Sequence, residues 1–240
     1  MDRIAPTRRP PGANAGTQNW RELLFLHWWV PVEALRPLVP ARLGLDLWEG
    51  RALVGIVPFR MEDVRPSWLP QVFSQNFLET NLRTYVHLDG EGPGVYFFSL
   101  EASSWLAVQA ARIGWGLPYH YATMGDTRTD GDERRYTSAR RSDASARLDV
   151  RCRLGAPLGA SPPDTLEAFL LERYLLYVER DGVLSRGQVH HTPYPAFAAD
   201  SLHCEEGLIA AAGLPGPARP PDLVHASPGV DVEVFALEVV

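Results

Sequence analysis

The segment NFLETNLRTYVHLDGEGPGVYFFSLEAS, residues 76–103, contains the strand and turn signals on which the predicted fold class depends. In its first half the polar residues Glu79, Asn81 and Arg83 alternate with Leu82 and other less polar residues. A period of two is typical of a strand with two unlike faces. The glycine-rich segment DGEGPG then separates this half from an aromatic and aliphatic half. The stretch therefore predicts a hairpin of strands over 76–88 and 94–103, joined by a glycine-rich loop.

The same pattern of strands and turns recurs along the chain. Further hairpins are predicted around Glu49-Gly50, around the DGD turn at 130–132 and around Asp181-Gly182. Other strands are predicted over 20–30 and 145–154, after residue 197, and over 230–240. So many hairpins favour an antiparallel closed barrel, or a strongly curved sheet, over a parallel α/β fold.

Short helices are expected between these strands. They are predicted over 104–114, 165–174 and 207–213, with one or two helical turns over 31–40. Ser103 or Ser104 is expected to cap the first of these and Gly114 to end it, and Asp164 is expected to cap the second. Residues 155–164 are expected to form a loop. The predicted class is therefore mostly β (α+β), with a flexible N-terminal arm over 1–18 and a single domain over 19–240.

Composition excludes several classes of function. The formal net charge is −6 and no basic run offsets it, so a nucleic-acid partner is not expected. No apolar run approaches the ~20 residues that span a bilayer, so no membrane partner is expected. Residues 1–18 lack the apolar core of a secretory signal, and Cys152 and Cys204 are too few for a disulfide framework, so a cytoplasmic location is expected. The chain contains no lysine, which excludes Schiff-base catalysis by a lysine amine.

The polar face of strand 76–88 carries the first candidate site residues. Glu79, Asn81 and Arg83 either face solvent or point into the interior of a barrel that holds a ligand. Residues four apart on a strand are separated by ~13 Å, so Glu79 and Arg83 do not pair directly. Each is free to face a neighbouring strand or a ligand.

The segment ARIGWGLPYH, residues 111–120, carries the second group of candidates. Arg112 falls late in a predicted helix, where a cation also suits the helix dipole. Tyr119 and His120 begin a predicted strand, so they point to opposite faces and only one of them can face a shared pocket. Packing of an aromatic side chain at a strand start is the competing interpretation.

No metal site or cofactor is predicted. His190 and His191 are neighbours on a strand and point apart, which makes joint ligation of one ion difficult. His203 and Cys204, with nearby acidic residues, have equally poor spacing. The sequence has no phosphate-binding loop, nucleophile elbow or zinc-protease motif.

The ordered motifs resemble those of one protein family. They are WRELLFLHWWVPVEALRPLVP (20–40), LDLWEGRALVGIVPFRMEDVRP (45–66), ETNLRTYV (79–86), GVYFFSLEA (94–102), ARIGWGLPY (111–119), LLERYLLYV (170–178) and HHTPY (190–194). This series resembles the uncharacterised bacterial DUF2071, or YqjF-like, family over roughly residues 20–235. That family is similar in turn to the acetoacetate decarboxylase superfamily, whose fold is a closed, cone-shaped β-barrel with flanking helices.

The resemblance implies where a site lies but not the decarboxylase chemistry. The decarboxylases carry a strand glutamate, a tight glycine hairpin and a segment that bears the Schiff-base lysine; here these places resemble Glu79, DGEGPG and residues 111–120. Tyr119 and His120 stand where the lysine and its neighbour would be. The resemblance therefore implies catalytic roles for Glu79 and Tyr119. It implies ligand-binding roles for Asn81, Arg83, Arg112 and His120.

Three functional hypotheses follow. The first is a small-molecule-binding barrel, with a carboxylate among the candidate ligands, that acts on a small organic acid or carbonyl compound by general acid/base chemistry. The second is a non-catalytic binding or sensing protein on the same fold. The third is an oligomeric structural protein, in which Trp28, Trp29 and Trp68 would mark an interface. A homo-oligomer is compatible with all three.

Overall fold

Residues 76–103 form the predicted hairpin. In the computed structural model, which describes residues 1–128, 133–217 and 219–240, β4 (Gln75–Leu88) pairs antiparallel with β5 (Glu91–Ala102). The loop is shorter than predicted, because β5 begins at Glu91. Asp89 and Gly90 alone make the turn, with φ of 51° and 81°, the left-handed geometry that an Asp-Gly pair adopts in a two-residue hairpin turn.

Strands dominate the rest of the described chain, which confirms the mostly-β prediction. The remaining strands are β1 (Gly16–Val30), β2 (Leu43–Leu45), β3 (Ala52–Pro66), β6 (Tyr119–Arg128), β7 (Glu133–Arg140), β8 (Arg147–Gly159), β9 (Leu175–Arg180), β10 (Val183–His190), β11 (Ala196–Glu206), β12 (Leu223–Val234) and β13 (Glu238–Val239). The helices are α1 (Val32–Leu35), α2 (Trp105–Trp115), α3 (Leu166–Leu171) and α4 (Leu208–Ala211), with short 3-10 turns at Ala5–Thr7, Arg36–Leu38 and Gln71–Phe73. The predicted DGD turn at 130–132 lies outside the described residues.

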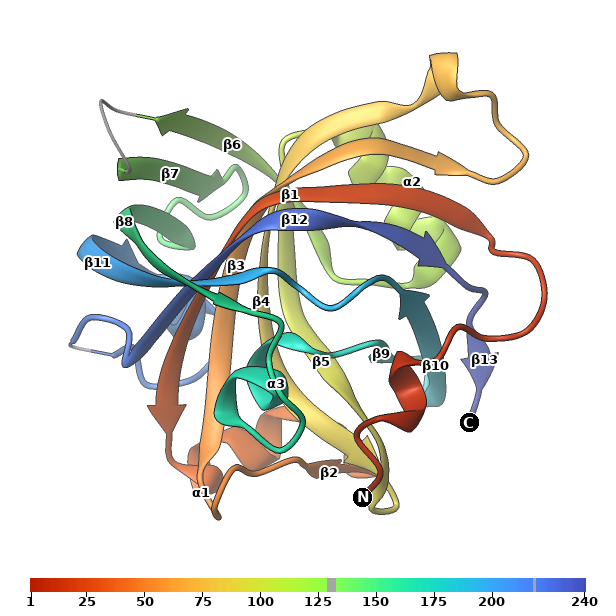
Figure 1. Cartoon of the computed structure of the whole chain (residues 1–240), viewed down its shortest axis with the longest axis horizontal. Coiled ribbons are helices and arrows are strands. Elements are labelled where there is room, and N and C mark those ends of the chain that lie inside the picture. Colours follow the sequence, from red (N-terminus) through yellow and green to blue (C-terminus); the bar gives the residue numbers. More distant parts are fainter. Residues whose placement is uncertain (129–132, 218) are drawn as a thin grey trace.

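β5 and β12 are two of the four described strands that pair with three others each, together with β4 and β10 (Figure 1). β5 pairs with β4 along its length, with β9 near its start and with β6 near its end. β12 likewise pairs with β1, β11 and β10. The strands β12, β1, β3, β4 and β5 thus form a shared layer. The strands at the two edges of this layer are β5 and β12. They are connected by the hydrogen-bonded series β6–β7–β8–β11 and, separately, by the pair β9–β10.

Two pairings depart from the antiparallel prediction. β5 lies parallel to β6 and to β9. For β6 the physical reason is the connection: α2 carries the chain from the end of β5 to the start of β6, and a helical crossover allows the two strands to run parallel.

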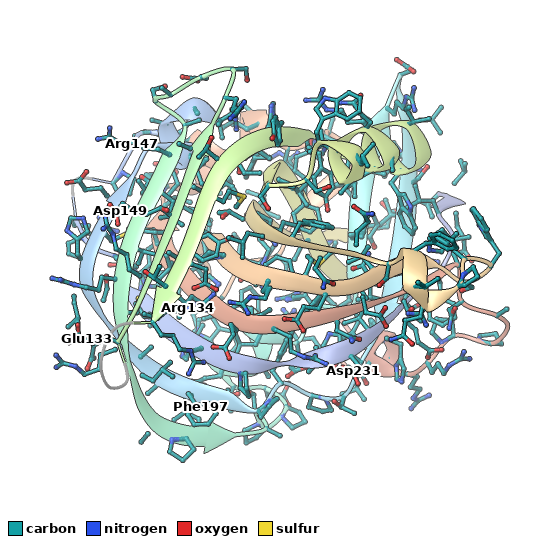
Figure 2. The ribbon with its side chains drawn as sticks, turned by 90° about the horizontal axis from the view of Figure 1, so that it is seen from above. Glu133, Arg134, Arg147, Asp149, Phe197 and Asp231 are labelled. Carbon is teal, nitrogen blue, oxygen red and sulfur yellow. The ribbon has the colours of Figure 1, made fainter. Side chains whose placement is uncertain are left out.

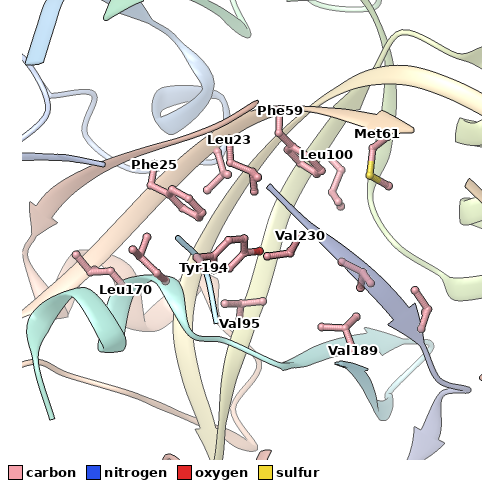
Figure 3. Close-up of a cluster of buried hydrophobic side chains, with 14 of the residues drawn as sticks. Leu23, Phe25, Phe59, Met61, Val95, Leu100, Leu170, Val189, Tyr194 and Val230 are labelled. Atoms are coloured by element: carbon pink, nitrogen blue, oxygen red, sulfur yellow. The ribbon is translucent and has the colours of Figure 1, made fainter. Parts of the chain in front are cut away.

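The shared layer separates two hydrophobic clusters. On one face, Leu23, Phe25, Phe59 and Tyr194 belong to a cluster that also includes residues of α3 and β10. Figure 3 shows Tyr194 among the labelled side chains of this cluster. On the other face, a second cluster joins the shared layer to β7, β8 and α4. Trp28 is buried in this second cluster, Trp29 is partly covered by Arg51, and Trp68 is 80% exposed.

Two acidic residues with positive φ reset which side chains face each cluster. Glu22 in β1 has φ 56° and Asp63 in β3 has φ 53°, and each lies at an irregularity in the strand register. A bulge adds one residue, so the alternation changes phase across it. Trp20 and Leu23 therefore share one face although they are three residues apart.

The helix ends differ from the prediction by a few residues. Ser104 caps α2 by accepting a hydrogen bond from the Ala107 amide, as predicted, but the helix continues past Gly114 to Trp115 and ends at Gly116 in the left-handed region. Thr165, and not Asp164, caps α3. α3 ends at Leu171, so Arg173 lies outside the helix predicted over 165–174.

Several strand boundaries also differ. β8 extends to Gly159, through residues that the sequence predicts as loop, because β11 pairs with it as far as that residue. The strand predicted over 230–240 is divided into two. β12 ends at Val234, and β13 pairs separately with β10. The predicted turn forms at Glu49-Gly50, closed by a bridge between Trp48 and Arg51. The strand before it, β2, pairs with β4, so β2 and β3 do not form a long hairpin.

The N-terminal segment contacts the sheet at several points. β1 begins at Gly16, so the last residues of the predicted arm belong to a strand. Arg3 pairs with Asp46 at 2.6 Å, Arg9 pairs with Glu233 at 2.7 Å, and the Gln188 amide donates to the Pro6 carbonyl. Flexibility of residues 1–18 stays a prediction, and movement of the segment would have to break these contacts.

Candidate functional site

One large cavity lies on the first face of the shared layer. Its volume is about 560 Å³, and the strands β1, β3, β4 and β5, the helix α2 and the start of β6 contribute to its wall. Most of the lining is apolar. The polar lining includes Glu79, Asn81, Arg83, Tyr119 and Arg173.

Glu79 and Tyr119 form a buried hydrogen-bonded pair in this wall. Glu79 lies opposite Ala102 of β5, and Tyr119 lies opposite Leu100 of the same strand, so β5 brings the two side chains together from β4 and β6. The Tyr119 hydroxyl donates to Glu79 Oε2 at 2.7 Å. Glu79 is only 3% exposed.

Burial shifts the pKa of both groups upward. It raises the pKa of Glu79 to about 8; the hydrogen bond from Tyr119 opposes this shift and the nearby charge of Glu101 adds to it. Burial likewise raises the pKa of Tyr119 well above its usual value, with Glu79 adding to the shift. A carboxyl whose pKa lies near neutrality suits proton transfer, because both of its forms are populated at ordinary pH.

Arg83 is a buried cation without an anionic partner. It is 8% exposed, and among the described residues no carboxylate lies within ion-pair distance of its guanidinium. Its Nη2 donates to the Leu170 carbonyl at 3.1 Å, but its Nε has no hydrogen-bond partner. Oδ1 of Asn81, two residues away on the same face, is also buried and unsatisfied. Such atoms are costly to bury without a partner, so they indicate a place for a ligand.

A second group of side chains holds the partner of Arg83 in place. Tyr85 lies 3.1 Å from the Leu170 carbonyl and 2.6 Å from His27 Nε2. Because a carbonyl can only accept, Tyr85 donates to Leu170, and His27 donates to Tyr85. Burial lowers the pKa of His27 well below its usual value, so the imidazole is neutral. Gly55 leaves room for this ring, since a Cβ there would lie 2.9 Å from His27 Cδ2.

The other two arginines in the wall, Arg65 and Arg173, have their charges balanced, Arg65 by Asp63. The contacts of Arg173 are the more buried. Arg173 donates to Asp46 Oδ2 at 2.7 Å and to the Phe169 carbonyl at 2.6 Å. Asp46 also accepts from Arg3. Burial lowers the pKa of Arg173 to about 10, and Asp46 opposes that shift. Arg173 and Arg83 therefore differ: one is already paired and the other is open to an anion.

The structure brings together four of the six predicted site residues. Glu79, Asn81, Arg83 and Tyr119 line the cavity, whereas Arg112 and His120 are not among its lining residues. Alternation explains His120, which follows Tyr119 on the strand and points to the other face. Burial, followed by the charges of Arg140 and Arg112, lowers the pKa of His120 to about 4. Arg112 Nε donates to the Tyr119 carbonyl at 2.6 Å, so it supports the backbone beside the site.

Sequence reasoning missed the groups that support the site. His27 and Tyr85 lie on strands predicted correctly, but their contact joins residues 58 positions apart. Arg173 falls inside the predicted helix, which hid its position after the helix end. The only available signal was the presence of charged or titratable residues within otherwise apolar segments.

A smaller cavity elsewhere lacks these features. Its volume is about 110 Å³, and its wall includes Arg134 and Phe197, labelled in Figure 2. Arg134 pairs with Asp126 at 2.7 Å, so its charge is balanced. Within the described ranges no group of three or more His, Cys, Asp or Glu residues is placed to hold a metal ion. No helix in the described chain is long and apolar enough to cross a membrane.

Comparison with solved structures defines the class of fold. The structure of the enduracididine biosynthesis enzyme MppR complexed with pyruvate superposes with a TM-score of 0.68 over 95% of this chain and 91% of its own, at 12% identity. Acetoacetate decarboxylase from Legionella pneumophila superposes with a TM-score of 0.63 over 100% of this chain and 96% of its own, at 15% identity. The fold is therefore that of the acetoacetate decarboxylase-like proteins.

Comparison of sequences gives the family. The DUF2071 family, described as an uncharacterized conserved protein, matches residues 17–231. The uncharacterized protein YqjF of Bacillus subtilis (strain 168) is 38% identical over 230 residues, which is 95% of this chain and 93% of that protein. The chain belongs to the DUF2071 family.

Proposed function

We propose that this chain binds a small molecule that carries a carboxylate group, and that Glu79 and Tyr119 exchange protons with it. The observation that carries the proposal is the buried, unbalanced guanidinium of Arg83 in the cavity wall that also holds the Glu79–Tyr119 pair. A carboxylate would satisfy Arg83 through charge-assisted hydrogen bonds. The complex of the similarly folded MppR with pyruvate, itself a carboxylate, supports this choice of ligand.

The geometry supports a general acid/base step. The Glu79 carboxylate accepts a proton from a carbon next to a ligand carbonyl. The electron pair of that C–H bond forms a C=C bond to the carbonyl carbon, and the π pair of the carbonyl moves to its oxygen, which becomes the oxyanion. Once Glu79 is protonated, its oxygen no longer needs the Tyr119 hydroxyl, which is then free to donate to the new oxyanion. Schiff-base decarboxylation has no place in this proposal, because the chain has no lysine.

Three expectations from the sequence remain part of the proposal. We propose that the curved sheet is a closed, cone-shaped barrel, which the additional pairings β4–β5 and β10–β12 support. A cytoplasmic location fits Cys152 and Cys204, which are both free thiols. Assembly into a homo-oligomer has exposed apolar side chains, such as Trp68, in its favour.

A thermal-shift screen with small carboxylates and keto acids tests the binding step. A ligand at a hundredfold excess over its Kd stabilises the fold by ~2.7 kcal/mol, which raises the Tm by about 5–10 °C. We expect this shift to disappear in Arg83→Gln and to persist in Arg151→Gln, an exposed arginine of β8 outside the cavity lining. A shift that is retained in Arg83→Gln, or lost equally in both variants, would contradict the site.

Isotope exchange tests the chemical step. A bound keto acid long enough to reach from Arg83 to Glu79 is expected to exchange carbon-bound hydrogen with D₂O in the presence of the protein, and Glu79→Gln is expected to abolish the exchange while binding is retained. Binding without exchange for every ligand found would favour the non-catalytic hypothesis.

A further inference from the structure

We propose that the ligand is an elongated monocarboxylic acid with an apolar body, bound with its carboxylate innermost and its reacting carbon well separated from that carboxylate. This inference rests on the proposed function. It adds the length of the ligand, its polarity and its direction in the cavity.

The separation of the two polar groups requires a long ligand. Glu79 and Arg83 are four residues apart on β4, about 13 Å along the strand. Their hydrogen bonds lead in different directions: Glu79 accepts from Tyr119 at the start of β6, whereas Arg83 donates to a carbonyl of α3. A ligand that touches both groups must extend along the strand.

The size of the cavity agrees with a long ligand. A volume of about 560 Å³ lies within the range of about 300–1,000 Å³ that holds drug-sized molecules. The share of one water in the liquid is about 30 Å³, so a molecule as small as pyruvate leaves most of this space to water against an apolar wall. An apolar ligand body in that space binds more tightly, because the apolar surfaces of both the ligand and the cavity wall are removed from water.

The order of residues along β4 gives the direction. Gln75, at the start of the strand, is exposed, Phe77 is buried, and Glu79, Asn81 and Arg83 follow in turn. All five line the cavity. Phe73 and Leu106 also line it and are 61% and 62% exposed, so they mark its mouth, where apolar side chains lie beside Gln75 and the Asp63-paired Arg65. The anion site therefore lies at the inner end, and the apolar body of the ligand extends past Glu79 toward the mouth.

Calorimetric titration with a chain-length series tests the inference. The probes are acetate, butanoate, hexanoate, octanoate and decanoate below their micelle-forming concentrations, with octan-1-ol as the probe that lacks a carboxylate. We expect the Kd to fall by about fourfold for each methylene added. Leu106→Ser is expected to raise the Kd for decanoate several-fold but to leave the Kd for butanoate unchanged. Ile113→Ser, on the same helix, 76% exposed and outside the lining, is the matched control.

The outcomes separate the two proposals. If acetate or butanoate binds as tightly as octanoate and Arg83→Gln abolishes that binding, the carboxylate site stands and the elongated ligand is wrong. If octan-1-ol binds as tightly as octanoate and Arg83→Gln changes neither, the carboxylate site is wrong and this inference falls with it. Chain-length dependence that disappears in Arg83→Gln supports both.

Discussion

At the scale of single residues, the site is defined by a contrast between buried charges that have partners and one that has none. Arg173 and Arg134 are each paired with an aspartate, and Glu101 is paired with Arg140 at 2.6 Å. Arg83, in the cavity wall, has no carboxylate within ion-pair distance among the described residues. Arg173 Nη2 also lacks a hydrogen-bond partner, but Asp46 balances the charge of Arg173. A buried guanidinium without a counter-charge costs stability unless a ligand completes the site.

Replacement of Glu79 with Gln is expected to change how stability depends on pH. In the folded protein the pKa of Glu79 is about 8, against 4.5 for the ordinary group, so between these values the unfolded chain loses a proton that the folded chain keeps. Stability therefore falls as pH rises, by up to about 1.4 kcal/mol per pH unit from this group, and levels off above pH 8. Glu79→Gln removes this contribution, so its Tm relative to wild type should rise from pH 5 to pH 8.

The matched control is Glu91→Gln, an exposed residue of the same hairpin. Thermal unfolding of the three proteins across the same buffers gives the comparison. Parallel curves for wild type and Glu79→Gln would show that Glu79 titrates normally and would remove the basis for a proton-transfer role.

Replacement of Tyr119 with Phe is expected to extend, to higher pH, the range over which the stability of the fold falls. The hydrogen bond from Tyr119 lowers the pKa of Glu79, so its loss raises that pKa further and stability keeps falling above pH 8. At neutral pH the unsatisfied carboxyl costs about 1–3 kcal/mol. Urea unfolding at several pH values measures both effects, with Tyr121→Phe on the same strand as control. A fall in stability that still ends at pH 8 would contradict the hydrogen bond.

Among the elements, the β4–β5 hairpin was predictable and the changes of phase were not. Alternation over residues 76–88 predicts β4 correctly, and the glycine-rich segment after it locates the turn, although the turn is only Asp89-Gly90 and not the longer loop predicted. Glu22 and Asp63 are different, because an acidic residue in a strand gives no local sign of a bulge. The bulge at Glu22 places both Trp20 and Leu23 on the cavity side, where Trp20 packs against Phe59 of β3. That placement depends on tertiary packing and not on nearby sequence.

The candidate site follows the same division. Glu79, Asn81, Arg83 and Tyr119 could be predicted because strand alternation places three of them on one face and the family resemblance supplies the fourth. The roles proposed for these residues stay predictions. The group formed by His27 and Tyr85 could not be predicted, since it depends on which strands become neighbours.

Gly229 provides a test of the bend in β1. It has φ 125° and lies opposite Arg21, where a Cβ would come within 2.0 Å of the Trp20 carbonyl oxygen. Gly229→Ala is therefore expected to destabilise the fold by about 2–4 kcal/mol. Gly182 also has positive φ but has open space around it, so Gly182→Ala should cost only about 1 kcal/mol. Denaturant unfolding gives both values, and equal losses would show that the close approach at Gly229 is absent.

At the scale of the whole molecule, Asp46 connects the N-terminal segment to the cavity wall. It accepts hydrogen bonds from Arg3 and from Arg173, which themselves lie 170 residues apart in sequence. The guanidinium groups of both arginines also lie over the Phe169 ring. This arrangement makes the first residues of the chain part of the support for the inner end of the cavity.

Replacement of Asp46 with Asn is expected to destabilise the whole fold. It leaves the buried guanidinium of Arg173 without its counter-charge, which costs about 3–5 kcal/mol. Asp231→Asn is the matched control, because Asp231 pairs with Arg21 at the surface and such pairs contribute about 0–1 kcal/mol. Urea unfolding distinguishes the two. If both variants lose the same small amount, the cluster does not support the cavity wall.

The long-range pairings of β5 and β12 also govern how quickly the chain can fold. β5 cannot complete its pairings until β9 arrives, and the pair Gly94–Leu175 closes a loop of 81 residues. β12 must find β1, which lies about 200 residues earlier: Gly16 pairs with Val234. Folding slows as contacts join more distant parts of a chain, so refolding is expected in the slow range of small proteins, milliseconds to seconds or longer. During that time β5 has an unpaired edge, and this exposed edge is where aggregation during refolding is expected to begin.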